Sequence, residues 1–149
     1  IALSEVFSHA GVFQYGTVDT ASIAFSGEVR RMCEVNTCRQ YGRTWACPPG
    51  LGTLAECQKR IQSYEKMVVF SARYALEDSF DYEGMMAGMS AFREVAGPLP
   101  FPDRSHGSIE GYGILVSDLA GQAGINYING ANTVTYFGAL LCDGKELLQ

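Results

Sequence analysis

The sequence lacks an excess of basic residues, and it lacks any long apolar run. It has 149 residues, with 11 Lys and Arg against 16 Asp and Glu and a formal net charge of −5 at pH 7. Because phosphate binding needs clustered cations, this balance argues against nucleic acid as the main partner. The longest apolar runs, such as Met67–Phe70 and Val134–Leu141, are too short to span a bilayer, so no membrane partner is expected.

Several sequence signals are also missing. No charged, then apolar, then small-residue leader opens the chain, so we expect no secretory signal, although the first residue is Ile1 and not Met. Repeats, low-complexity tracts and linkers are absent, and the length suits a single domain over residues 1–149. Dinucleotide, Walker, nucleophile-elbow and His-Glu-x-x-His motifs do not occur. The sequence therefore contains none of these catalytic motifs. It does not decide whether the protein forms a homo-oligomer.

Cysteine is scarce except in one part of the chain. Four of the five cysteines lie within one 25-residue stretch; the five are Cys33, Cys38, Cys47, Cys57 and Cys142. A secreted disulfide scaffold would be shorter and would spread an even number of cysteines along the chain. The pattern favours a reduced cytoplasmic protein with a thiolate cluster.

The periodicity of apolar residues predicts helices and strands in mixed order. Helices are expected over 2–10, 53–64, 82–95 and 109–123, and strands over 12–18, 22–25, 67–75, 125–128 and 133–141. Thr53 and Glu56 form a capping box, and Asn129-Gly130 predicts a hairpin between the last two strands. Residues 30–52 and 97–106 read as loops. We expect an α+β domain with a mostly antiparallel sheet, packed helices and a cysteine-rich metal-binding loop.

The loop over residues 30–52 carries most of the chemical information. Cys33, Cys38 and Cys47 occur there at spacings of five and nine residues. Soft thiolate ligands select zinc, Cu(I) or iron–sulfur clusters, and glycines and prolines let a loop wrap an ion. The local arginines at 30, 31, 39 and 43 would lower thiol pKa values and balance an anionic cluster, and Trp45 could cover it from water.

The metal is less sharply defined than its ligands. Structural zinc usually uses Cys-x-x-Cys knuckles, which are absent, so we favour an iron–sulfur centre over zinc. An electron-transfer or redox-accessory role with a redox protein partner would follow. The alternative is that the three cysteines are small buried apolar side chains, which their clustering argues against. Cys57 is either a fourth ligand or a residue of a helix core, and Cys142 is interpreted as structural.

The segment Cys33 to Cys38-x-x-Tyr41-Gly42-x-x-Trp45-x-Cys47-Pro-Pro resembles a family of bacterial and archaeal predicted metal-binding proteins classed as a domain of unknown function. Three further segments are similar to that family, at residues 76–85, 101–114 and 132–138. The resemblance implies metal binding through Cys33, Cys38 and Cys47, and it implies no established reaction.

One departure from the family concerns a second cysteine-rich stretch. Family members carry it shortly before the Phe-Pro step, with one cysteine at the position of Leu99 here. Residues 92–100 contain no cysteine, and the junction between Glu94 and Leu99 is short for a member of this family. The second cluster is either lost or carried by a stretch outside this sequence, so the fourth ligand stays open.

An acidic cluster provides a second candidate site. Glu77, Asp78, Asp81 and Glu83 place four carboxylates within seven residues. They could bind a hard cation or act as acid and base, or they could be a solvated loop before a helix N-terminus. A metalloenzyme using Asp78, Asp81 and Glu83 with His106, or a zinc-stabilised interaction module, is therefore an alternative function.

Overall fold

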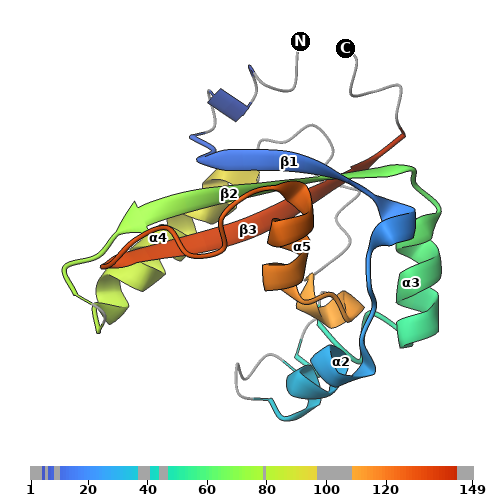
Figure 1. The fold of residues 1–149 in the computed structure, drawn as a ribbon. Coiled ribbons are helices and arrows are strands. Elements are labelled where there is room, and N and C mark those ends of the chain that lie inside the picture. The colour runs from blue at the N-terminus through green and yellow to red at the C-terminus, as the bar shows by residue number, and fades with distance from the viewer. Residues whose placement is uncertain are drawn as a thin grey trace.

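The structure is a computed structural model, and it describes residues 5, 7–8, 11–36, 41–43, 47–78, 80–96 and 109–143. Figure 1 shows how the elements are arranged, with colours that follow the order of the chain. They are β1 (Gln14–Asp19), the 3₁₀ helix η1 (Thr20–Ser22), α2 (Gly27–Glu34), α3 (Leu54–Gln62), β2 (Lys66–Ala75), α4 (Tyr82–Ala96), the 3₁₀ helix η3 (Glu110–Tyr112), α5 (Val116–Ala123) and β3 (Thr133–Cys142).

The strands form one antiparallel sheet with β2 in the centre. In the described part of the chain the order is β1-β2-β3, with Val18 opposite Met67 and Met67 opposite Leu141. Six consecutive residues of β2 are buried, because helices cover both faces of the sheet. The predicted α+β class with an antiparallel sheet is confirmed.

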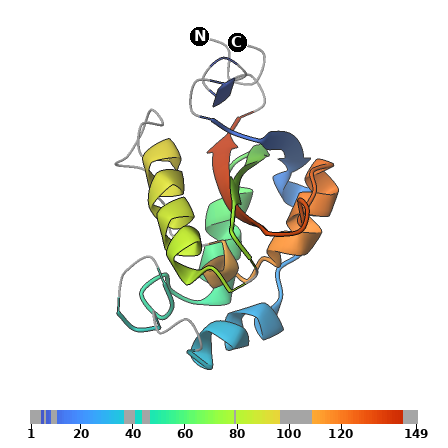
Figure 2. The same ribbon diagram turned by 90° about the vertical axis from the view of Figure 1, so that its left-hand side faces the viewer.

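Each face of the sheet has its own core. Met67 and Val69 face the cluster that contains residues of α3, α5 and η3, while Val68 and Phe70 face a cluster that includes Phe7 and Phe92 of α4. Figure 2 shows α4 and α5 on opposite sides of the sheet. Alternate residues of β2 thus divide between two apolar layers, as the two-residue period of a strand requires.

Two predicted strands are wrong. Ser22 is the last residue of η1, residues 23–25 follow it without forming a strand, and residues 125–128 form none either. Ile125 is buried in the core beneath the helices, and the amide of Asn126 donates to Gln14 Oε1 at 2.9 Å. The predicted hairpin is therefore also wrong, because residues 125–130 form a loop and β3 pairs with β2 instead.

The predicted helix over 109–123 is divided. Gly113 has φ +79°, a left-handed conformation that ends η3, and α5 begins three residues later. The predicted loop over 30–52 is also wrong at its start, because α2 extends to Glu34. Of the predicted helix over 2–10, Glu5, Phe7 and Ser8 are described and are helical; the predicted loop over 97–106 lies outside the described residues.

Within the described ranges, no helix combines the length and the apolar character that crossing a bilayer requires.

Candidate metal centre

Cys33 lies on a helix and not in the loop that the sequence predicts. The Ser26 side chain accepts a hydrogen bond from the amide of Glu28 at 3.2 Å and caps the N-terminus of α2. Cys33 occupies the last turn of that helix and is half-buried. Asn36 follows with φ +62° and turns the chain away from the helix. The helix therefore delivers one thiol to the start of the loop.

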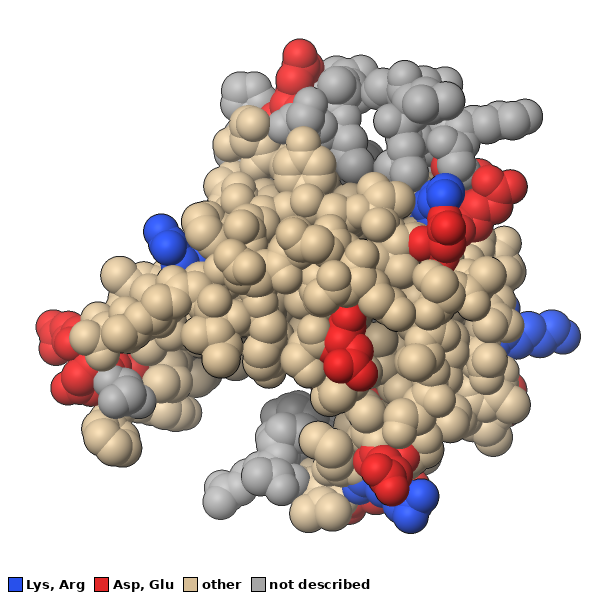
Figure 3. All heavy atoms as spheres, viewed as in Figure 1, with Lys and Arg blue, Asp and Glu red and all other residues tan. Residues whose placement is uncertain are grey.

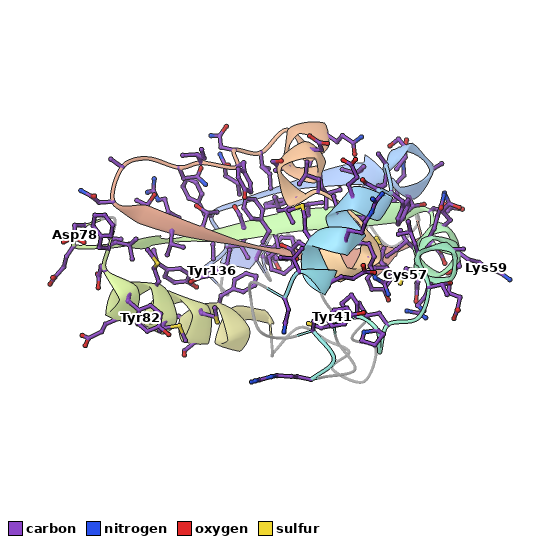
Figure 4. The ribbon with its side chains drawn as sticks, turned by 90° about the horizontal axis from the view of Figure 1, so that it is seen from below. Tyr41, Cys57, Lys59, Asp78, Tyr82 and Tyr136 are labelled. Atoms are coloured by element: carbon purple, nitrogen blue, oxygen red, sulfur yellow. The ribbon has the colours of Figure 1, made fainter. Side chains whose placement is uncertain are left out.

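The loop after α2 is folded back on itself by hydrogen bonds. Asn36 Oδ1 accepts from the amide of Tyr41 at 3.0 Å, and the amide of Gly42 donates to the Pro48 carbonyl at 2.8 Å. The second bond brings the backbone beside Cys47 back to the turn at Tyr41 and Gly42. Cys47 is half-buried, and Pro48, which follows it, is buried. Figure 4 shows Tyr41 on the loop, on the same side of the molecule as Cys57.

Cys38 and Trp45 lie outside the described residues, and so does His106. Within the described ranges no group of three or more His, Cys, Asp and Glu side chains is placed to hold a metal ion. The two described cysteines of the motif, Cys33 and Cys47, lie at the two ends of the folded loop. Half-buried thiols at such a place fit a thiolate-bound metal, because they combine shielding with access.

Cys57 is in a helix core. Its side chain is 0% exposed in α3, its Sγ donates to the Leu51 carbonyl at 3.5 Å, and it accepts from Arg30 Nη1 at 3.6 Å. These partners explain the burial of the thiol without a metal ion. Of the two interpretations of Cys57, the structure supports the helix core. Cys142 is buried at the end of β3 against the other core, which agrees with a structural role.

A second guanidinium packs beside the same carbonyl. Arg60 Nη1 donates to the Tyr112 hydroxyl at 2.8 Å, and Arg60 Nη2 donates to the Leu51 carbonyl at 3.3 Å. Burial raises the pKa of Tyr112, and the nearby guanidinium partly opposes that rise. The hydrogen bond to Tyr112 raises the pKa of Arg60 above its usual value. This cluster joins α3 to η3 and is part of the fold.

The acidic cluster has a structural role at Asp81. One carboxylate oxygen accepts from the amide of Glu77 at 3.0 Å, and the other accepts from the amide of Gly84 at 2.9 Å. These bonds lower the pKa of Asp81, because they stabilise its ionised form. Asp78 Oδ1 accepts from the amide of Phe80 at 2.8 Å. Both carboxylates therefore shape the turn that leads into α4.

The acidic cluster is also remote from the buried Cys57. Figure 4 shows Asp78 at one end of the molecule and Cys57 with Lys59 at the other. In the described part of the chain, a hollow of about 460 Å³ lies against α5 and one of about 410 Å³ against α3, and no residue of the acidic cluster lines either. On the face in Figure 3 the charged side chains gather mainly towards the edges. The geometry gives the metalloenzyme alternative no support.

A comparison with known families gives one match. Residues 16–100 match the family described as "Predicted metal-binding protein (DUF2284)". The chain belongs to this family. The matched residues of this DUF2284 member run from β1 into the segment after α4, and they include the whole loop that carries Cys33, Cys38 and Cys47. Metal binding is thus predicted for the family, while the cysteine motif itself stays a prediction. Neither the curated proteins nor the solved structures contain a match to the chain.

Sequence reasoning missed the position of Arg30. The sequence pattern predicts that the arginines near the cysteines form one group of cations around a cluster. In the structure Arg30 turns inward towards backbone carbonyls, whereas Arg31 and Arg43 are exposed. The signal was available in principle: Val29, Arg30 and Cys33 share one face of a helix that begins at the Ser26 cap.

Proposed function

We propose that this DUF2284 protein is a small cytoplasmic metal-binding protein that holds an iron–sulfur centre, with zinc as the alternative, through the thiolates of Cys33, Cys38 and Cys47. The observation that supports the proposal most is the closure of the loop. Asn36 bonds to Tyr41, and Gly42 bonds to Pro48, so the backbone next to Cys33 and the backbone next to Cys47 belong to one folded segment.

The chemistry of the loop supports the same proposal. Thiolates are the donors that iron–sulfur clusters and zinc share, and Cys38 follows Asn36 by two residues in the sequence. Arg31 and Arg43 are exposed cations on either side of the Asn36 turn, and they suit a centre with net negative charge. Cys57, which is occupied by Leu51 and Arg30, is left out of the ligand set.

An iron–sulfur centre supplies one-electron transfer when it is bound. The residues of this chain would hold it, shield it from water and balance its charge. We therefore propose a redox-accessory role, in which a separate redox protein donates or accepts the electron.

Anaerobic isolation of the protein, followed by visible absorption and analysis for iron, sulfide, zinc and copper, tests the proposal. We expect brown protein with iron and sulfide, or colourless protein with zinc. Cys33→Ser, Cys38→Ser and Cys47→Ser are each expected to lower the metal content, and Cys142→Ala is the control that keeps it. A protein without iron, zinc or copper after attempted reconstitution would overturn the proposal.

A further inference from the structure

The guanidinium of Arg30 bonds to three separate segments of the chain. Its Nη1 donates to the Gly111 carbonyl at 3.0 Å and contacts Cys57 Sγ at 3.6 Å. Its Nη2 donates to the carbonyl of Gly52. Arg30 itself is half-buried on α2. One side chain therefore connects α2 to the turn before α3, to α3 itself and to η3.

The bond from Arg30 to Gly52 closes a loop across a separation of 22 residues. Cys33, Cys38 and Cys47 all lie inside that loop. Cys33 is one helical turn after Arg30 in α2, so fixing the guanidinium also fixes the helix that carries this thiol. The amide of Gly52 donates to Pro49 at 3.0 Å, which ties the other end of the closure to the segment after Cys47.

We propose that Arg30 is the positioning residue of the metal loop: its guanidinium holds the two ends of the loop together, so that Cys33 and Cys47 are presented to one metal. This inference rests on the proposed function for the ligands. Bringing distant thiols together costs chain entropy, and a closure made in the metal-free protein removes part of that cost before the metal binds.

Geometry explains why arginine is needed at this position. A guanidinium presents donors in a planar fork, so it can reach Gly52 and Gly111 at the same time. A lysine ammonium is a single point of attachment on a flexible stem, and we expect it to satisfy one of the two carbonyls. Lysine at position 30 should therefore restore part of the effect and not all of it.

Arg60 provides a matched control. Like Arg30, it is half-buried. Its guanidinium donates to the carbonyl of Leu51, the residue before Gly52, and to the hydroxyl of Tyr112. It lies on α3 and not on the helix that carries Cys33. Arg60→Gln thus removes a comparable half-buried guanidinium without releasing α2.

The experiment measures Zn²⁺ affinity by chelator competition and the thiolate charge-transfer absorption of bound Co²⁺ in the full-length chain. Arg30→Gln is expected to weaken Zn²⁺ binding by about tenfold to a hundredfold and to change the Co²⁺ spectrum. Arg30→Lys should fall between Arg30→Gln and the wild type. Arg60→Gln should stay within about twofold of the wild-type affinity, even where it lowers stability.

Amide hydrogen exchange of the metal-free chain separates this inference from the proposed function. The amides of Gly42 and Gly52 should exchange faster in Arg30→Gln and keep the wild-type rate in Arg60→Gln. Faster exchange in a protein that binds neither Zn²⁺ nor Co²⁺ and takes up no iron would overturn the proposed function while the loop closure stands. Unchanged exchange and affinity in Arg30→Gln, or an equal loss of affinity in Arg60→Gln, would overturn the inference.

Discussion

Gly16 is a position where the sheet has no room for a side chain. A Cβ atom there would lie 1.9 Å from the Ala123 carbonyl oxygen at the end of α5. Backbone cannot yield as a flexible side chain would, so we predict that Gly16→Ala lowers the free energy of unfolding by about 3 kcal/mol. Urea unfolding followed by circular dichroism measures the change.

Gly121 is the matched control for this prediction. It lies in α5 itself, and a Cβ atom there would meet nothing within 4 Å. Gly121→Ala should raise the free energy of unfolding by about 0.5 to 1 kcal/mol, because alanine favours a helix over glycine. Equal effects of the two substitutions would show that α5 does not pack against β1 as described.

Asp81 gives a prediction of pH dependence. Its pKa is lower in the folded protein than the usual value of 3.8, because the amides of Glu77 and Gly84 bond to the carboxylate. A group whose pKa falls on folding stabilises the fold above its unfolded pKa, and this contribution is lost as the pH drops through the folded-state value. Asp81→Asn should lower the melting temperature at pH 7 and reduce its fall between pH 5 and pH 3.

Glu83→Gln is the comparison for Asp81, since Glu83 is exposed in the first turn of the same helix. The melting temperature of this variant should stay near that of the wild type at both pH values. A larger change in melting temperature for Glu83→Gln than for Asp81→Asn would contradict the role of Asp81 as the carboxylate that accepts from the amides of Glu77 and Gly84.

At the scale of elements, α3 begins with a complete capping box. The Thr53 hydroxyl accepts from the amide of Glu56 at 3.2 Å, and the Glu56 side chain accepts from the backbone of Thr53. Thr53→Ala should lower the free energy of unfolding by about 1 kcal/mol. Thr53→Ser keeps a hydroxyl and should retain most of the wild-type free energy of unfolding. A Thr53→Ser variant as unstable as Thr53→Ala would contradict the capping box.

Elements with local signals could be predicted from the sequence. The capping box located α3, and the alternating and apolar runs located β1, β2 and β3. One error came from a long-range effect. Residues 125–128 have the composition of a strand, but Ile125 is buried under helices and Asn126 bonds to Gln14, a residue 112 positions away. No local pattern reports such a contact.

At the candidate site, too, local features could be predicted from the sequence and long-range contacts could not. Clustering of Cys33, Cys38 and Cys47 is visible in the sequence, whereas the inward orientation of Arg30 depends on carbonyls at Gly52 and Gly111, on other elements. The sequence also could not decide between a ligand and a core role for Cys57. The burial of its Sγ against Leu51 decided it.

At the scale of the molecule, the folded core and the loop are separate sources of stability. The two apolar clusters lie on the faces of the sheet, and the buried Leu51, in the turn before α3, belongs to the cluster that contains Met67 and Val69. We therefore predict that chelation leaves the amides of β2 protected from hydrogen exchange and speeds exchange at Gly42 and Gly52. Global unfolding on chelation would instead favour the zinc-stabilised interaction module.

The central claim is that thiolates of the loop bind the metal, and X-ray absorption at the edge of whichever metal copurifies with the chain tests it most directly. The account predicts a first shell dominated by sulfur, at about 2.3 Å for zinc, and loss of sulfur scattering in the Cys33→Ser and Cys47→Ser variants. A first shell of oxygen and nitrogen atoms alone would contradict it.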